Sequence, residues 1–195
     1  MRLHAAMQAL GALGFCATIG VCALCITQST AQTAKQDQPQ AGNGASPIYG
    51  VTIPAGYRDW RVIAVGQLAG GNLKQLRAQL GNDVAIQAFR EGTRPFPDGT
   101  IIAALHWNEI PSDENDKVLA SGFPGAGLQS SVIGSAVNVQ FMVKDSQKYA
   151  ATGGWEFADF KNGTPGDEML HKTCFPCHAP AKDRDFVFTR YAPTP

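Results

Sequence analysis

Residues 131–160 read SVIGSAVNVQFMVKDSQKYAATGGWEFADF, and this stretch decides the fold class of the 195-residue chain. Residues 131–143 are rich in β-branched and other apolar side chains and predict one long strand. Residues 154–160 alternate apolar and polar side chains, which predicts a second strand. Because successive strands separated by turns are typical of antiparallel pairing, this half of the chain favours an antiparallel sheet.

Two further strands are predicted closer to the N-terminus. Residues 61–65, RVIAV, read as a buried strand, and Gly70-Gly71 then turns the chain. Residues 100–107 read as a strand that follows the turn RPFPDG at residues 94–99, whose Asp-Gly pair is the strongest turn signal. The order of elements lacks the regular βαβ alternation of a parallel sheet. We therefore predict an α+β fold with a mainly antiparallel β-sheet and short peripheral helices.

Three short helices are predicted around these strands. The helical patterns are Leu73, Leu76 and Leu80, then residues 83–90 capped by Asn82 or Asp83, and residues 167–172. Residues 185–189 predict an extended segment that closes the chain. The sequence shows no internal repeat.

A C-x-x-C-H motif, Cys174-Phe-Pro-Cys177-His178, directly follows the last predicted helix. Two thiols and an adjacent imidazole at this spacing are the signature of covalent haem c attachment. The thiols form thioethers with the haem vinyl groups, and the imidazole ligates the iron. A disulfide or a redox-active C-x-x-C would use the same cysteines, but neither explains the adjacent histidine. We predict that Cys174, Cys177 and His178 hold haem c near the C-terminus.

The first 31 residues have the pattern of a secretory signal peptide. Arg2 is their only charged residue, residues 9–26 are an unbroken run of apolar or small side chains, and residues 29–31 offer a small-residue cleavage site. A run of this length can also just span a bilayer as an uncleaved anchor. Cleavage is the prediction, with export to the periplasm and no membrane span in the mature chain.

Cysteine usage supports this prediction. Cys16, Cys22 and Cys25 all lie within residues 1–31, so the mature chain keeps only the two motif cysteines. Val21 and Leu24 precede Cys22 and Cys25, whereas a lipoprotein signal needs a small residue there. The pattern therefore argues against lipidation.

The remaining 164 of the 195 residues are enough for one domain with a single core. Residues 32–50 are rich in Gln, Gly, Ala and Pro and predict a flexible leader, which leaves residues 51–195 as the haem domain. Without Arg2 the 16 basic side chains become 15 against 16 acidic ones, a net charge of −1. This balance indicates neither a nucleic acid nor an anionic surface as a partner.

The place of the motif excludes the commonest haem c architectures. A small helical electron carrier usually has the motif near its N-terminus and a methionine ligand downstream, but only 17 residues follow His178 and none is Met. Met142 lies in the long strand pattern, where a core position is expected, and Met169 is too close to the motif to reach the opposite haem face. Four long helical patterns, as in a four-helix bundle, are absent. A haem held against a sheet, without an obvious strong sixth ligand, is expected.

Three stretches resemble the cytochrome P-460 family: FPDGTIIAALHW at residues 96–107, NVQFMVKDSQKYAATGGWEFADF at residues 138–160 and KTCFPCHAPAKDRDFVFT at residues 172–189. The likeness runs from about Tyr57 to Tyr191. It implies a mostly antiparallel β fold, a homodimer and a five-coordinate haem c with His178 as the axial ligand. The family includes hydroxylamine-oxidising enzymes and relatives called cytochrome c′-beta, which bind nitric oxide and carbon monoxide.

The resemblance also implies a departure at Ala104. Hydroxylamine-oxidising members carry a lysine cross-linked to the porphyrin in the strand after the Asp-Gly turn, and aligning that turn places the lysine position at Ala104. No lysine occurs between Lys74 and Lys117. Because alanine cannot form the cross-link, an ordinary haem c is expected, as in the c′-beta members.

Strand geometry adds His106 as a further candidate. Side chains at i and i+2 share a face, so His106 points the same way as Ala104 and could act as a distal acid or a weak sixth ligand. A histidine exposed beside Trp107 at the end of the strand is the simpler expectation. His171, on the helix before the motif, is expected to face solvent.

Two charged residues become distal-pocket candidates through the resemblance. Arg77 aligns with a distal arginine of the family, whose guanidinium could hydrogen-bond an anionic or partly reduced nitrogen ligand. Glu168 lies where some active members have an acid for proton relay. The alternatives are a solvated helix residue for Arg77 and, for Glu168, a surface residue that favours the helix dipole.

Two functions stay open. In the first, an exported mono-haem cytochrome has an open iron site that binds nitric oxide or processes hydroxylamine. In the second, the protein is a passive electron-transfer cytochrome or a haem-dependent structural module, with His106, Met142 or another side chain in the sixth position. A redox partner protein is compatible with both.

Overall fold

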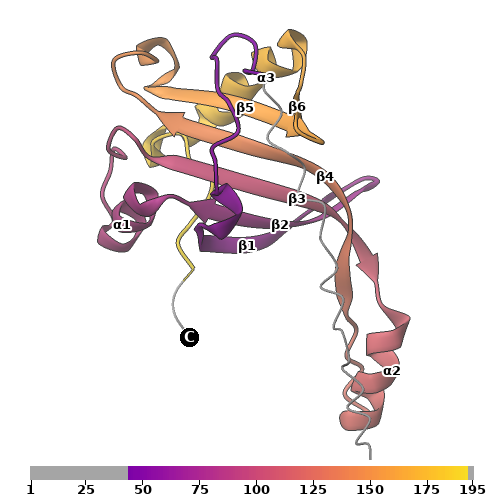
Figure 1. The fold of residues 1–195 in the computed structure, drawn as a ribbon. Coiled ribbons are helices and arrows are strands. Elements are labelled where there is room, and N and C mark those ends of the chain that lie inside the picture. Colours follow the sequence, from indigo (N-terminus) through magenta and orange to yellow (C-terminus); the bar gives the residue numbers. More distant parts are fainter. Residues whose placement is uncertain (1–43, 193–195) are drawn as a thin grey trace, which may run out of the picture. The chain divides into compact units, whose positions relative to one another are not determined.

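The structure is a computed structural model that describes residues 44–192, and these contain one antiparallel sheet (Figure 1). Its strands follow one another in chain order: β1 (Arg61–Gly70), β2 (Leu73–Gly81), β3 (Ile101–Pro111), β4 (Ser131–Lys144), β5 (Trp155–Lys161) and β6 (Thr164–Pro165). The helices are α1 (Asp83–Glu91), α2 (Asp113–Gly122) and α3 (Glu168–His178), with short 3-10 helices at Tyr57–Asp59, Ala150–Thr152 and Ala179–Arg184. The predicted α+β class is confirmed, since all neighbouring strands pair antiparallel.

Residues 73–81 form strand β2, so the helix predicted from Leu73, Leu76 and Leu80 is wrong. β2 pairs with β1 on one edge and with β3 on the other. Leu76 and Leu80 are four residues apart, a spacing that shares one side of a helix and also one face of a strand. The polar Arg77 and Gln79 alternate with them on the other face of β2. Arg77 is therefore a strand residue.

The other predicted elements form with changes in length. The strands predicted at residues 61–65, 100–107, 131–143 and 154–160 become β1, β3, β4 and β5. Helix α1 begins after Asn82, whose side-chain oxygen accepts a hydrogen bond from the Ala85 N–H at 3.0 Å. Helix α3 continues the helix predicted at residues 167–172 through the C-x-x-C-H motif.

Two segments differ from the sequence expectations. Helix α2, which no sequence pattern indicated, lies at the far end of the long ribbon formed by β3 and β4 (Figure 1). Residues 185–189 are not extended throughout, because Asp185 and Phe186 adopt left-handed backbone angles with φ of 54° and 63°. These two residues turn the chain sharply after α3.

Each face of the sheet has its own hydrophobic cluster. We call the face that carries Ile102, Ala104 and His106 the motif face, because Cys174 and Phe175 of α3 pack against its cluster. That cluster is Ile63, Ala85, Ile86, Ala88, Phe89, Phe96, Ile102, Met142, Trp155, Phe157 and Val187. Residues 49–60 cover the opposite face, whose cluster is Val51, Leu80, Ala103, Leu105, Phe141, Ala158 and Phe160. The core position expected for Met142 is confirmed.

The packed part of the chain begins before Val51. Ser46 is 3% exposed, and its hydroxyl oxygen accepts a hydrogen bond from the Val51 N–H at 3.0 Å. The end of the predicted flexible leader, residues 44–50, is therefore part of the folded domain. The predicted signal peptide at residues 1–31 and the leader up to residue 43 lie outside the described residues. None of the helices in residues 44–192 combines the length and the hydrophobicity of a transmembrane span.

Candidate functional site

Helix α3 carries the C-x-x-C-H motif in its last two turns. The helix begins after Asp167, whose carboxylate accepts a hydrogen bond from the Leu170 N–H at 2.8 Å, and it ends at His178. Residues three and four apart share one side of a helix. Cys174 therefore faces the same way as Cys177 and His178. The fold brings the three predicted haem-binding residues together.

His171 anchors this helix to the sheet. Its side chain is fully buried, and its Nε2 accepts a hydrogen bond from the Asp159 N–H of β5 at 3.2 Å. Its Nδ1 lies 2.7 Å from the Asp167 carbonyl oxygen and donates to it. Both ring nitrogens are thus used by the backbone on either side. The expectation that His171 faces solvent is wrong, because one side of α3 packs directly against β5.

The His178 ring is held in one orientation beside β5. Its Nδ1–H donates to the Phe186 carbonyl oxygen at 2.8 Å, and the ring lies 4.7 Å from the Phe157 ring and 5.0 Å from the Phe188 ring, centroid to centroid. Burial lowers the pKa of His178, while the bond to Phe186 acts in the opposite direction. A neutral imidazole with its proton on Nδ1 leaves the lone pair of Nε2 for a metal.

The two motif thiols are free, and Cys174 is half-buried while Cys177 is exposed. Burial, with smaller contributions from Asp159 and Cys177, raises the pKa of Cys174 to about 11. A redox-active C-x-x-C depends on a thiol whose pKa is lowered, so that the thiolate forms near neutral pH. The environment of Cys174 therefore argues against the redox alternative.

Three rows of cross-strand neighbours cross the motif face, because residues opposite one another in an antiparallel pair point to the same side. The first row is Gly81, Ile102, Met142 and Phe157; the second is Gln79, Ala104, Gln140 and Asp159; the third is Arg77, His106 and Asn138. Successive rows are about 7 Å apart along the strands. The first row is apolar and contacts His178 through Phe157. Polarity increases from there towards the third row.

The middle of the motif face is open to solvent. Ala104 is half-buried and Gln140 is exposed, although β3 and β4 are central strands. Phe188, which touches the His178 ring, is 48% exposed. A large flat group lying here would cover exposed apolar surface beside a neutral imidazole and two thiols. The residues present therefore fit a covalently attached haem.

The third row contains buried polar atoms that lack a hydrogen-bond partner. His106 is 6% exposed, and its Nδ1 lies 3.1 Å from Gln75 Oε1. Among the described residues, Arg77 Nε, His106 Nε2 and Asn138 Oδ1 are buried without a hydrogen-bond partner. With Nδ1 donating to Gln75, His106 Nε2 is an acceptor, and Arg77 Nε–H is a donor. Such atoms are normally satisfied by a bound group or an ordered water.

Burial and neighbouring charges shift the pKa of His106 in the third row. Burial, and then the positive charge of Arg77, lowers the pKa of His106, and the carboxylate of Asp159 raises it. Asp159 Oδ2 accepts hydrogen bonds from the side-chain amides of Asn138 and Gln140 at 2.5 and 2.9 Å. The expectation that His106 is exposed beside Trp107 is therefore wrong. His106 is a buried residue of the motif face, two positions from Ala104.

A separate cavity lies on the opposite face of the sheet. Residues 53–59 line it together with residues 105–107, 136–139, 160, 162 and 163, so His106 and Asn138 border it as well. Several of these residues belong to the second hydrophobic cluster or pack against it, and no residue of the C-x-x-C-H motif is among them. The cavity is not part of the haem-binding motif.

Comparison with known protein families shows to which family the chain belongs. The family model for cytochrome P460 matches residues 54–189, from the first 3-10 helix to the segment after α3. The chain belongs to the cytochrome P460 family. The match confirms the resemblance found in the sequence and makes the protein a haem cytochrome. A search of curated proteins gives no match.

In this cytochrome P460 the candidate residues separate into two groups. Arg77, Ala104 and His106 all lie on the motif face. Glu168 does not, because its side chain is 63% exposed and forms an ion pair with Lys172 at 2.6 Å. Glu168 is at the N-terminal turn of α3, where an acid favours the helix dipole, as the alternative interpretation expected.

Other residues of the site were missed in the sequence. Asn138 and Gln140 precede Met142 at even spacing, and this period of two was the available signal for their shared face. Asp159 follows Phe157 in the same way. The partner of His178, Phe186, had no local signal, since the contact depends on the left-handed turn at residues 185 and 186.

Proposed function

We propose that this cytochrome P460 is an exported mono-haem c-type cytochrome whose iron is five-coordinate and binds nitric oxide or a related small nitrogen species. Cys174 and Cys177 would hold the haem, and His178 would ligate the iron. The bound haem would supply an iron centre able to bind such a ligand. The observation that supports the proposal most directly is the solvent-exposed centre of the motif face at Ala104 and Gln140, where Ala104 itself offers no ligating atom.

The two methionines of the described chain that lie near the motif are poorly placed as a sixth ligand. Met142 packs between Ile102 and Phe157 in the apolar row, and Phe157 touches the His178 ring. Met142 is only 9% exposed, so its side chain is enclosed in the apolar cluster. Met169 is 78% exposed on α3. These positions argue against both methionines and leave His106, whose Nε2 is buried without a partner among the described residues, as the side chain that would compete with an external ligand.

The chain's own residues offer hydrogen bonds near that site. Arg77 Nε–H is a donor and His106 Nε2 an acceptor, in the row next to that of Ala104. The three rows contain no lysine, so they provide no amine for a cross-link to the porphyrin. An ordinary haem c spectrum is the consequence.

The proposal is tested on the chain produced with a haem c maturation system. Mass spectrometry should show one covalently bound haem, and the ferrous protein should bind nitric oxide readily with little or no turnover of hydroxylamine. As a matched control, Cys177→Ser should leave one thioether and a loosely held haem. A wild-type mass without haem, or a ferrous iron that does not bind nitric oxide, would overturn the proposal.

Hydroxylamine is the second candidate ligand, because two hydrogen-bond acceptors of the third row are unpaired among the described residues. His106 Nε2 and Asn138 Oδ1 both accept hydrogen bonds, which nitric oxide cannot donate and hydroxylamine can. Titrating the ferric protein with hydroxylamine tests this candidate. Binding that His106→Leu weakens at least tenfold, with nitric oxide affinity unchanged, would favour hydroxylamine as the ligand; equal effects on both would exclude this assignment.

Export and a homodimer complete the proposal, and a redox partner protein would exchange electrons with the iron. The signal-like residues 1–31 support a periplasmic location. The ribbon around α2 has exposed apolar side chains that support self-association, namely Ile110, Val118, Phe123, Leu128, Val132 and Ile133. Light scattering of the purified protein should give twice the chain mass. Substituting Val118 and Phe123 by Ser should give monomers, and an unchanged mass would count against this surface.

A further inference from the structure

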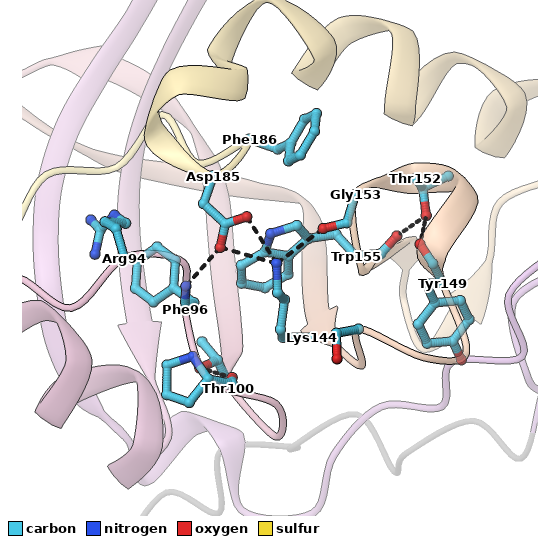
Figure 2. A network of polar contacts seen from close by, with 12 residues as sticks. Arg94, Phe96, Thr100, Lys144, Tyr149, Thr152, Gly153, Trp155, Asp185 and Phe186 are labelled. Atoms are coloured by element: carbon cyan, nitrogen blue, oxygen red, sulfur yellow. Dashed lines mark hydrogen bonds and ion pairs between the residues drawn. The ribbon is translucent and has the colours of Figure 1, made fainter.

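A buried ion pair involves Asp185, the residue before Phe186, whose carbonyl oxygen accepts the hydrogen bond from His178. Lys144 Nζ, at the end of β4, contacts Asp185 Oδ1 at 2.8 Å and Oδ2 at 3.1 Å, and the side chains are only 5% and 9% exposed (Figure 2). Lys144 Nζ also donates to the Gly153 carbonyl oxygen at 3.0 Å and lies 4.9 Å from the centre of the Trp155 ring. A pair buried this deeply is weak evidence for stability alone, because desolvation offsets much of the attraction. Its place suggests a more specific role.

Asp185 fixes the shape of the chain directly after the 3-10 helix Ala179–Arg184. Its Oδ2 also accepts a hydrogen bond from the Phe96 N–H at 2.7 Å, so the carboxylate links three separate segments. Asp185 and Phe186 are both left-handed, a backbone conformation that is unfavourable for residues other than glycine and persists only when the surroundings impose it. The ion pair and the Phe96 bond are such surroundings.

The same turn presents the partner of the proximal histidine. The Phe186 carbonyl oxygen accepts the His178 Nδ1–H at 2.8 Å. The Phe186 ring packs against Gly153, where a Cβ would collide with it, and Gly153 is also the residue whose carbonyl oxygen accepts from Lys144. Lys144 thus contacts both the residue before Phe186 and the residue on which its ring rests (Figure 2).

We propose that Lys144 and Asp185 are positioning residues for the iron ligand: they hold the Phe186 carbonyl against His178 Nδ1. A carbonyl that accepts this proton makes the imidazole a stronger donor to a metal and fixes its ring orientation. A stronger donor stabilises ferric over ferrous iron and lowers the reduction potential. The inference rests on the proposed attachment of haem through His178. It adds a control of iron chemistry by two residues outside the C-x-x-C-H motif.

The test uses haem-loaded protein and two variants of similar side-chain size. Asp185→Asn removes one charge, and Lys144→Met with Asp185→Asn removes both. The readouts are the iron–histidine stretching frequency of the ferrous protein, the reduction potential, and the solvent exchange rate of the His178 Nδ1 proton measured by NMR. Glu168→Gln, which breaks the exposed pair with Lys172 on the same helix, is the control.

Both variants should weaken the hydrogen bond from His178 Nδ1 to the Phe186 carbonyl oxygen. The iron–histidine stretching frequency should then fall and the reduction potential should rise. Exchange of the His178 Nδ1 proton should be about tenfold faster, as expected for losing about 1.4 kcal/mol of hydrogen bonding. Glu168→Gln should change none of these. If Asp185→Asn fails to fold, the double variant decides, since it buries no unpaired charge. A double variant whose frequency, potential and proton exchange equal those of the wild type overturns the inference. A double variant that fails to fold overturns it as well, because the ion pair would then stabilise the whole fold and not the iron ligand in particular. Absence of haem from the wild type would instead refute the proposed function.

Discussion

Replacing His171 by Leu should detach α3 from the sheet and destabilise the protein strongly. The side chain is fully buried and bonds Asp159 N–H and the Asp167 carbonyl oxygen. A buried N–H left unpaired costs about 1–3 kcal/mol, and a lost hydrogen bond costs about 1 kcal/mol. The Asp167 carbonyl keeps its bond from the His171 backbone N–H, so only the smaller cost applies to it. We expect a loss of about 2–4 kcal/mol.

Urea unfolding of the haem-loaded protein measures this loss. His171→Gln, whose side-chain oxygen can replace Nε2 as the acceptor for Asp159, should recover part of it. Lys172→Ala, which changes the exposed neighbour, should stay within about 0.5 kcal/mol of wild type. If His171→Leu also stays within that range, the anchoring role assigned to His171 is wrong.

Three further predictions concern the motif face and its neighbours. Ala104→Lys should allow a porphyrin–peptide cross-link under peroxide, visible as a mass that survives thioether cleavage; a cross-link in the natural protein would contradict the account. Because burial lowers the pKa of His106, stability should be full above its ordinary pKa of 6.5 and fall as the pH drops below it. Urea unfolding of His106→Gln at pH 7.5 and 5.5 should show a smaller fall than wild type, and an equal fall would refute this. Burial raises the pKa of Glu156, so Glu156→Gln should be more stable than wild type at pH 8, and a loss of stability there would show that the carboxylate is stabilised by its neighbours.

The sheet was predictable from the sequence because its strands carry their own signals. The long pattern at residues 131–143 and the alternation at residues 154–160 are local properties, and both strands form. The C-x-x-C-H motif is equally local. The β2 error has a physical cause, since leucines four residues apart satisfy a helix and a strand alike. Only pairing with β1 and β3 decides between them.

The distal side of the site depends on tertiary contacts that the sequence does not encode locally. His106 was correctly placed on the face of Ala104, but its burial depends on Gln75 and the neighbouring strands. His171 looks like a surface residue until the helix is docked on β5. Lys144 and Asp185 are 41 residues apart in the chain and meet only in the folded protein.

The proposed function requires an iron that His178 ligates and that keeps one coordination position free for an external ligand. An absorption spectrum of the dithionite-reduced protein, recorded before and after carbon monoxide, tests it most directly. We expect a high-spin five-coordinate ferrous haem c that converts fully to the carbon monoxide complex. A low-spin six-coordinate ferrous spectrum that carbon monoxide leaves unchanged would show that a side chain of the protein fills the site and would contradict the account.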